Sequence, residues 1–303
     1  MSKLYSAYQA TTSTEHSTID TGKMKIAVTV ATYNQPDALA AVLEGYLNQS
    51  DKSFELIIAD DGSTADIAEL VKKYQARAPF PVKHIWQEDN GYQASAIRNR
   101  AIAATSADYI VYTDGDCVPP VDYVANQRAL AEPGWFLAGN RLLLSQAFTQ
   151  KVFQEKLPIY KWQFRDWLSA YKSGFIERLL PLIRLMHLGP FRKLTPQRWK
   201  GAKTCNLSAF RQDLLFVNGM DESYTGWGME DSDLVIRLLR AGIRHKSARL
   251  SVPVLHLWHR ENDRSKLLEN QQRLKAVIAA THIRAIRGVD QYLSAQENPG
   301  QPS

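Results

Sequence analysis

The sequence predicts an α/β fold in which a mostly parallel sheet carries helices on both faces. Short apolar, β-branched runs alternate with segments of helical spacing between residues 26 and 113, the pattern of strands joined by crossover helices. Each run ends in polar residues, and such sheets bind their ligands beyond the carboxyl ends of the strands. We therefore expect a site built from strand ends.

The elements of this half follow in regular order. The first strand, Ile26–Ala31, stops at Tyr33-Asn34-Gln35-Pro36, and Pro36 suits the first turn of the helix that continues over 38–47. The other expected strands are 54–59, 82–86 and 108–113, and the other expected helices are 67–74 and 93–104. Further along we expect a helix over 234–239 with an acidic first turn, a strand over 252–258 and one long helix over 267–292.

The composition excludes several classes of protein. The chain has 303 residues, of which only Cys117 and Cys205 are cysteines, so neither a disulfide framework nor a cysteine-based zinc site is expected. A reducing cytoplasm is the simplest compartment. No apolar stretch is long enough to span a bilayer, and the start lacks the apolar region of a signal peptide. No glycine-rich dinucleotide or P-loop motif follows the first strand.

The positive charge is concentrated in one segment. Of the net charge of +6, residues 151–203 carry 12 basic against 3 acidic residues, so the rest of the chain is slightly acidic. This distribution indicates a local basic face and argues against nucleic acid as a partner. The segment also holds nine aromatic residues: Phe153, Tyr160, Trp162, Phe164, Trp167, Tyr171, Phe175, Phe191 and Trp199.

Two interpretations of residues 151–203 remain open. Residues 175–186 are amphipathic at helical spacing, so the segment could be a helical subdomain packed on the core. Alternatively it lies on an anionic cytoplasmic leaflet, with cations such as Arg184, Arg192 and Lys193 at the headgroups, which would make the protein peripheral to the inner face of the cell membrane.

Three short motifs carry candidate chemistry. Asp114-Gly115-Asp116 ends an expected strand and could present two carboxylates to one hard cation, although a lone motif of this kind is more often an ordinary turn. Residues 226–233, Gly-Trp-Gly-Met-Glu-Asp-Ser-Asp, combine a glycine-framed tryptophan with acids that could cap a helix or act as a general base. His256 and His259 could be structural residues or could bind a metal ion. In the second case, imidazole ligands would favour Mn²⁺ over Mg²⁺.

Together these motifs resemble a family. Residues 24–265, apart from 147–198, are similar to family 2 glycosyltransferases of the GT-A fold with a β1,4-galactosyltransferase-like C-terminal region. The resemblance is carried by the first strand with Thr32-Tyr33-Asn34, by Asp60-Asp61-Gly62-Ser63, Ala96-Ile97-Arg98-Asn99 and Asp114-Gly115-Asp116, and by 217–222, 226–231 and 256–259. It departs from vertebrate galactosyltransferases at His256, where those enzymes carry a methionine ligand.

The resemblance implies roles for individual residues. The donor nucleotide would be bound by Thr32, Tyr33, Asn34, Asp60, Asp61, Arg98 and Asp114. The metal, Mn²⁺ or Mg²⁺, would be held by Asp114, Asp116, His256 and His259. The sugar and acceptor would meet Trp227, Gly228 and Glu230, and Asp231 would be the catalytic base. The implied reaction is an inverting transfer from a UDP-sugar to a glycan or lipid-linked acceptor in bacterial cell-surface polysaccharide or lipopolysaccharide synthesis.

The expected organisation has five parts: a flexible arm over 1–23, a nucleotide-sugar-binding half over 24–146, a basic and aromatic helical insertion over 147–203, an acceptor and catalytic half over 204–265, and a C-terminal helix and tail over 266–303.

Two other functions stay open on the residues alone. A nucleotidyltransferase could use the same sheet and paired carboxylates, although the chain lacks a basic glycine-rich loop for a triphosphate. A non-enzymatic membrane-surface or nucleic-acid module would explain the basic segment but not the acids at three strand ends.

Overall fold

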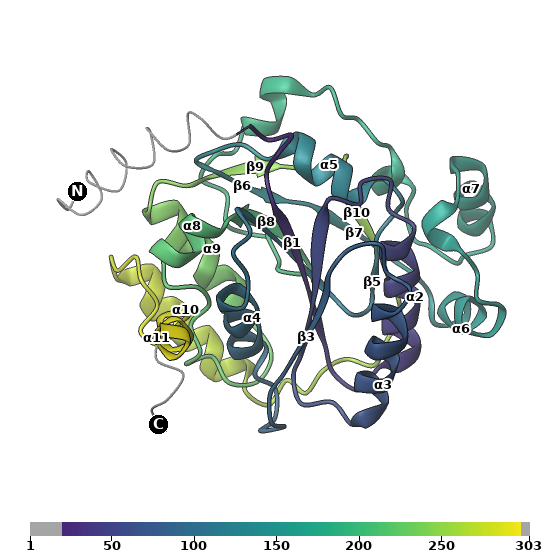
Figure 1. The fold of residues 1–303 in the computed structure, drawn as a ribbon. Coiled ribbons are helices and arrows are strands. Elements are labelled where there is room, and N and C mark those ends of the chain that lie inside the picture. Colours follow the sequence, from purple (N-terminus) through teal and green to yellow (C-terminus); the bar gives the residue numbers. More distant parts are fainter. Residues whose placement is uncertain (1–19, 298–303) are drawn as a thin grey trace.

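The structure is a computed structural model that describes residues 20–297, so the expected N-terminal arm lies almost entirely outside it. A seven-stranded sheet forms the centre (Figure 1). Its spatial order is β3 (Val82–Trp86), β2 (Phe54–Asp60), β1 (Ile26–Thr32), β4 (Tyr109–Asp114), β8 (Asn206–Phe210), β6 (Trp135–Ala138) and β9 (Arg244–Ser247). A smaller sheet has the order β5 (Cys117–Val118), β10 (Pro253–His256) and β7 (Asn140–Leu143).

The first four strands of the large sheet run parallel, as the alternating pattern predicts. In register, Val28 of β1 lies beside Leu56 of β2 and Val111 of β4. Only β8 opposes this direction, because it pairs antiparallel with both β4 and β6. The predicted α/β class with a mostly parallel sheet is therefore confirmed.

Helices cover both faces of the large sheet (Figure 1). The first are α2 (Pro36–Leu47), α3 (Ala65–Gln75), α4 (Ala94–Ala103) and α5 (Tyr123–Leu130), and the later ones are α8 (Arg211–Phe216) and α9 (Glu230–Arg240). Successive strand residues point to opposite faces. Val28 accordingly packs in the core under α2 and α3, whereas Ala27 packs in a second core with α4, α8 and α9.

The basic insertion is helical, but the expected helix over 175–186 is wrong. The insertion contains α6 (Gln146–Glu155), α7 (Phe164–Lys172) and three short 3₁₀ turns at Ile159–Lys161, Leu180–Leu182 and Gly189–Lys193. Gly174 ends α7 in a left-handed conformation, Ile176 then forms a β-bridge with Leu144, and Pro181 cannot join a helix interior. The apolar side chains of residues 175–186 therefore belong to an irregular segment that packs on the core.

The expected single C-terminal helix is also wrong, because it divides into α10 (Leu267–Ala279) and α11 (Asp290–Glu297). Arg240 ends α10 by donating from its guanidinium to the carbonyl oxygens of Val277, Ile278 and His282. Further on, a Cβ on Gly288 would overlap the backbone of Asn218, so this chain segment crosses too closely for a regular helix to continue. Within residues 20–297 no helix is long and apolar enough to cross a membrane.

A fully buried ion pair fixes α9 beneath the site. Arg237 and Asp233 are both 0% exposed, and Nε of Arg237 donates to Asp233 at 2.8 Å. The same guanidinium donates through Nη1 to the carbonyl oxygens of Val217 and Gly219 at 2.7 and 2.8 Å. One side chain therefore ties the helix that carries Glu230 to the preceding turn.

We expect Arg237→Ala to lower the free energy of unfolding by about 3–5 kcal/mol, because it leaves the Asp233 carboxylate buried without its partner. Chemical denaturation measures the loss. Lys275→Ala, on the exposed side of α10, is the matched control and should change stability little. Equal stability of the Arg237→Ala variant and the wild type would contradict the structural role of the pair.

Candidate active site

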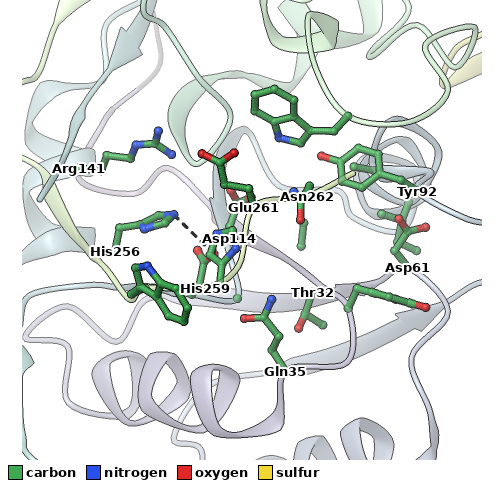
Figure 2. Close-up of a pocket in the computed structure, with 18 of the residues that line it drawn as sticks. Thr32, Gln35, Asp61, Tyr92, Asp114, Arg141, His256, His259, Glu261 and Asn262 are labelled. Carbon is green, nitrogen blue, oxygen red and sulfur yellow. Dashed lines mark ion pairs between the residues drawn. The ribbon is translucent and has the colours of Figure 1, made fainter. Parts of the chain in front are cut away.

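A cavity of about 430 Å³ opens at the carboxyl ends of β1 and β4, where the sequence predicts a site. Figure 2 shows Asp61 and Tyr92 at one end of it and Arg141 and His256 at the other, with Asp114 between them. The predicted site residues that line it are Thr32, Tyr33, Asp61, Arg98, Asp114, Asp116, Trp227, His256 and His259.

The turn after β4 is shaped by a glycine. The backbone N–H of Gly115 donates to the carbonyl oxygen of Ala31 at 2.7 Å, which draws the turn onto the end of β1. A Cβ on Gly115 would lie only 2.8 Å from Oγ1 of Thr32, so a larger residue would push the turn away. This close approach sets the positions of Asp114 and Asp116.

The small sheet brings the late histidines to Asp116. Strand β10 pairs antiparallel with β5, with His256 opposite Cys117, and the N–H of Leu257 donates to the carbonyl oxygen of Asp116 at 2.8 Å. As a result, Nε2 of His259 lies 3.1 Å and Nε2 of His256 lies 3.6 Å from Oδ2 of Asp116. Residues about 140 positions apart along the chain thus form one cluster of three possible metal ligands.

The ring proton of His259 determines how this cluster can meet a cation. Nδ1 of His259 lies 2.6 Å from the carbonyl oxygen of Arg260, a contact that requires the ring proton on Nδ1. The lone pair of Nε2 then faces the Asp116 carboxylate, and two acceptors approach this closely only with a proton or a metal ion between them. A proton in that place is the hydrogen bond with Asp116 that raises the pKa of His259, and a metal ion would displace this proton. Burial lowers the pKa of His256, which favours its neutral, ligating form. Two imidazoles and a carboxylate are a suitable donor set for Mn²⁺.

Cys117 forms a hydrogen bond with Asp116, and its sulfur also belongs to a second possible ligand group with Asp114 and Asp116. Its Sγ lies 3.2 Å from Oδ1 of Asp116. Burial raises the pKa of the Cys117 thiol well above its usual value, so the sulfur stays protonated and donates to the carboxylate. One oxygen of Asp116 is thereby occupied, and the other remains directed at the histidines.

Arg98 is held in place by Asp114, and part of its guanidinium group remains able to donate hydrogen bonds. Its Nη2 donates to Oδ1 of Asp114 at 2.7 Å. Although Arg98 is buried, its Nε and Nη1 atoms have no hydrogen-bond partner among the described residues. Burial raises the pKa of Asp114 to about 6, against the opposing charge of Arg98. A ligand with acceptor oxygens would satisfy the unused donors of Arg98.

Asp61 forms the far end of the cavity. Its carboxylate accepts hydrogen bonds from Nε2 of Gln87 at 2.6 Å and from the backbone N–H of Gln93 at 2.8 Å. Burial raises its pKa to about 6, and these two hydrogen bonds partly offset the rise. Tyr92 lines the same end.

Two predicted nucleotide-binding residues do not line the cavity. Asp60 is fully buried behind it, where its carboxylate accepts from the N–H of Ser63 at 2.9 Å and faces Nε2 of His84 at the same distance. Asn34 adopts a left-handed conformation, and its Oδ1 accepts from the N–H of Thr64. Both side chains are used to shape the loops after β1 and β2, so the structure assigns them a supporting position.

The glycine-framed loop lies over the cavity with the acids behind it. Trp227 lines the cavity, and Gly226, Gly228 and Met229 all have positive φ angles of 70°, 110° and 78°. These angles turn the chain sharply into α9 and leave Gly228, Glu230 and Asp231 outside the residues that line the cavity. The loop is therefore a strained connection, and its two predicted site acids do not line the cavity.

The two acids differ in their surroundings. Oδ1 of Asp231 accepts a hydrogen bond from the hydroxyl of Thr204 at 2.5 Å. Glu230 is 6% exposed, and burial together with the neighbouring charge of Asp231 raises its pKa to about 7. Oε2 of Glu230 has no partner among the described residues. The charges of both acids raise the pKa of Arg98, which itself pairs with Asp114 in the cavity.

Several lining residues escaped the sequence analysis: Gln35, Tyr92, Arg141, Trp258, Glu261, Asn262 and Arg264. Some had a local signal, since Trp258 lies between the two histidines and Tyr92 follows the Asn90-Gly91 turn. Arg141 had none, because only the pairing of β7 with β10 brings it to the site.

Comparison with known proteins gives two adjacent family matches. The family "Glycosyl transferase family 2" matches residues 27–181, and "N-terminal domain of galactosyltransferase" matches residues 192–260. Validoxylamine A glucosyltransferase of Streptomyces hygroscopicus subsp. jinggangensis is 28% identical over 224 residues, which cover 72% of this chain and 52% of the relative. Chondroitin synthase of Escherichia coli is 27% identical over 238 residues, which cover 73% and 33%. The chain thus spans about half or less of the length of these relatives.

Solved structures share the fold at low sequence identity. S. aureus TarS 1-349 in complex with UDP has a TM-score of 0.56 at 14% identity, covering 91% of this chain and 71% of that one. Mannosyltransferase PcManGT from Pyrobaculum calidifontis, in complex with GDP-Man and Mn²⁺, has a TM-score of 0.55 at 17% identity, covering 90% and 69%. The fold is that of the GT-A glycosyltransferases. With its family match over half of its length, the chain belongs to glycosyl transferase family 2.

Proposed function

We propose that this chain is an inverting, metal-dependent glycosyltransferase that transfers a sugar from a UDP-sugar to a glycan acceptor. The observation that carries the proposal is the cluster of Asp116, His256 and His259. It lies in one cavity with the carboxylate of Asp61 on one side and the acid-bearing loop of Trp227 over it. The fold, the cavity and the order of the motifs all support the same reaction.

The donor would lie along the cavity with its base toward Asp61. An ionised Asp61 accepts hydrogen bonds and would receive the N–H of uracil, while the unused donors of Arg98 would meet ribose or phosphate oxygens. Asp116, His256 and His259 would hold Mn²⁺ or Mg²⁺, with Asp114 beside them. Such a cation, when bound, neutralises the charge of a departing diphosphate.

The acceptor would be activated by Asp231. This carboxylate would take the proton of an acceptor hydroxyl as the oxygen attacks the anomeric carbon from the face opposite the leaving group, which inverts the configuration. Thr204 donates to Oδ1 and leaves Oδ2 to receive the proton. Glu230 would position the acceptor. Because Asp231 is not among the residues that line the cavity, the loop of Trp227 would have to shift when substrates bind, and its closure would exclude water.

A role in cell-surface polysaccharide or lipopolysaccharide synthesis is the setting we propose. The relatives include a synthase named for chondroitin, and the solved neighbours contain UDP in one case and GDP-Man with Mn²⁺ in another.

The nucleotidyltransferase alternative predicts release of pyrophosphate from UTP. The proposed function instead predicts slow hydrolysis of a UDP-sugar when no acceptor is present, so one assay of both substrates separates them.

The first test concerns the metal. We expect Asp116→Asn to abolish Mn²⁺-dependent binding of UDP and sugar transfer, because the variant removes the anionic ligand between the two histidines. Calorimetric titration of UDP with and without Mn²⁺ measures binding, and a screen of UDP- and GDP-sugars measures transfer. Asp66→Asn, on the exposed first turn of α3, is the matched control. Full transfer by Asp116→Asn, or by the wild type in excess chelator, would refute the metal site.

The second test separates the two acids. We expect Asp231→Asn to lower kcat by about 10²–10⁴-fold, the usual effect of losing a general base, while UDP affinity stays unchanged. Glu230→Gln keeps the shape of a residue whose raised pKa already favours a proton near pH 7, so it should mainly raise the KM for the acceptor. If Glu230→Gln loses turnover and Asp231→Asn keeps it, the roles are reversed.

The basic insertion supports a peripheral position on the inner face of the cell membrane, which we propose in a revised form. Arg184 and Lys193 do not face headgroups, because they pair with Asp122 and Glu132 at 2.5 Å each. Arg192 is buried and donates to Ser251. The insertion instead offers exposed apolar side chains, and its exposed cations Arg165 and Lys172 have no ion pair within residues 20–297. The most exposed of these apolar side chains are Leu180, Phe191 and Leu194, at 62%, 69% and 73%.

The third test is sedimentation with vesicles. We expect the wild type to pellet with anionic vesicles at low salt, and Phe191→Ser with Leu194→Ser to reduce the pelleted fraction because the side chains that enter the headgroup layer are lost. Ile286→Ser is the matched control, since Ile286 is 83% exposed but lies outside the insertion. A wild type that stays in the supernatant with anionic vesicles at low salt would exclude the membrane contact.

A further inference from the structure

A positively charged side chain occupies the end of the cavity farthest from the proposed base-binding end. Arg141 lies on the same side as His256, away from Asp61 and Tyr92 (Figure 2). It comes from β7, the strand that pairs with β10 in the small sheet. Arg141 lies opposite Val254, two residues before His256 on the neighbouring strand.

Three more arginines continue from Arg141 onto the surface. Nη2 of Arg178 donates to the carbonyl oxygen of Arg141 at 3.2 Å. A Cβ on Gly201 would lie 3.3 Å from Nη2 of Arg249 and 4.0 Å from Nη2 of Arg198, so both guanidinium groups flank this glycine. The charges of Arg198 and Arg178 both act on Arg249, whose pKa is lowered first by burial and then by these like charges. We call these four residues the arginine cluster.

The arginine cluster lacks the acidic partners found elsewhere. Within residues 20–297, no ion pair joins any of the four to a carboxylate, whereas Arg184 and Lys193 of the same insertion each have one. Like charges without compensation destabilise the folded chain slightly and create a local positive potential that attracts anions. Guanidinium groups bind carboxylates and phosphates with two parallel hydrogen bonds.

We infer that the arginine cluster binds acidic groups, carboxylate or phosphate, on the acceptor glycan where it leaves the cavity. The inference rests on the proposed function, since it names the class of acceptor for the same site. The donor does not explain the whole cluster, because Arg178, Arg198 and Arg249 lie outside the cavity. Only a chain that extends beyond the cavity reaches all four arginines, and a glycan polymer has that form.

The experiment measures binding of labelled oligosaccharides to the full chain by fluorescence anisotropy. The probes are an oligogalacturonate that carries carboxylates, a glycerol-phosphate oligomer that carries phosphates, and a neutral maltooligosaccharide. We expect at least one acidic probe to bind, with an affinity that falls as salt is raised, and the neutral probe not to bind. The preferred acidic probe identifies which anion the cluster takes. Arg178→Gln with Arg249→Gln should weaken that binding roughly 5- to 30-fold.

Lys72→Gln with Lys73→Gln, two exposed cations of α3, is the control with the same loss of charge and should bind as the wild type does. Titration of UDP with Mn²⁺ reports on the donor site, so the two proposals can fail separately. Equal binding of the neutral probe, no binding of either acidic probe, or unchanged affinity in the arginine variant would overturn the inference. It would also fail if that variant loses pelleting with anionic vesicles but keeps its affinity for the acidic probe.

Discussion

The antiparallel pairing of β5 with β10 is the contact on which the site depends. It consists of two residues on each strand, with His256 opposite Cys117 and Leu255 opposite Val118. A shift of one residue in this register would move His256 to the other side of the sheet and away from Asp116. The neighbouring strand β7 then supports β10 on its far edge and brings Arg141 to the same cavity. Asp116, His256 and the start of the arginine cluster thus share one backbone constraint.

Burial of charge gives this cavity its chemical character. Arg98 and Glu230 are both nearly excluded from solvent, and burial shifts the pKa of Glu230 to about 7 and that of Asp114 to about 6. Such groups destabilise the fold unless they are paired, and the pair of Arg98 with Asp114 compensates only one of them. Within residues 20–297, two donors of Arg98 and one oxygen of Glu230 have no hydrogen-bond partner, and a bound ligand would satisfy them. The site therefore holds polar groups in positions that the fold alone does not require.

The sequence was a good guide wherever the relevant pattern is local. Alternating runs identified β1 to β4 and α2 to α4, and the motif at Asp114-Gly115-Asp116 was found where the turn lies. Patterns failed where a distant contact decides the structure. Arg240 ends α10 from another helix, and Asp60 is turned away from the cavity by Ser63 and His84. Arg141 could not have been found, because its place depends on a strand about 110 residues later.

The two halves of the chain are joined in one sheet, which bears on how the site can form. Strand β8, from the second half, lies between β4 and β6, which both come from the first half, and β9 then pairs with β6. The boundary between the two family matches, near residue 190, is therefore not a boundary in the core. Asp61 and Asp116 from one half line the same cavity as Trp227, His256 and His259 from the other. The insertion that connects the halves carries Arg178, which contacts Arg141 of β7, so the arginine cluster is attached to the same small sheet that holds His256.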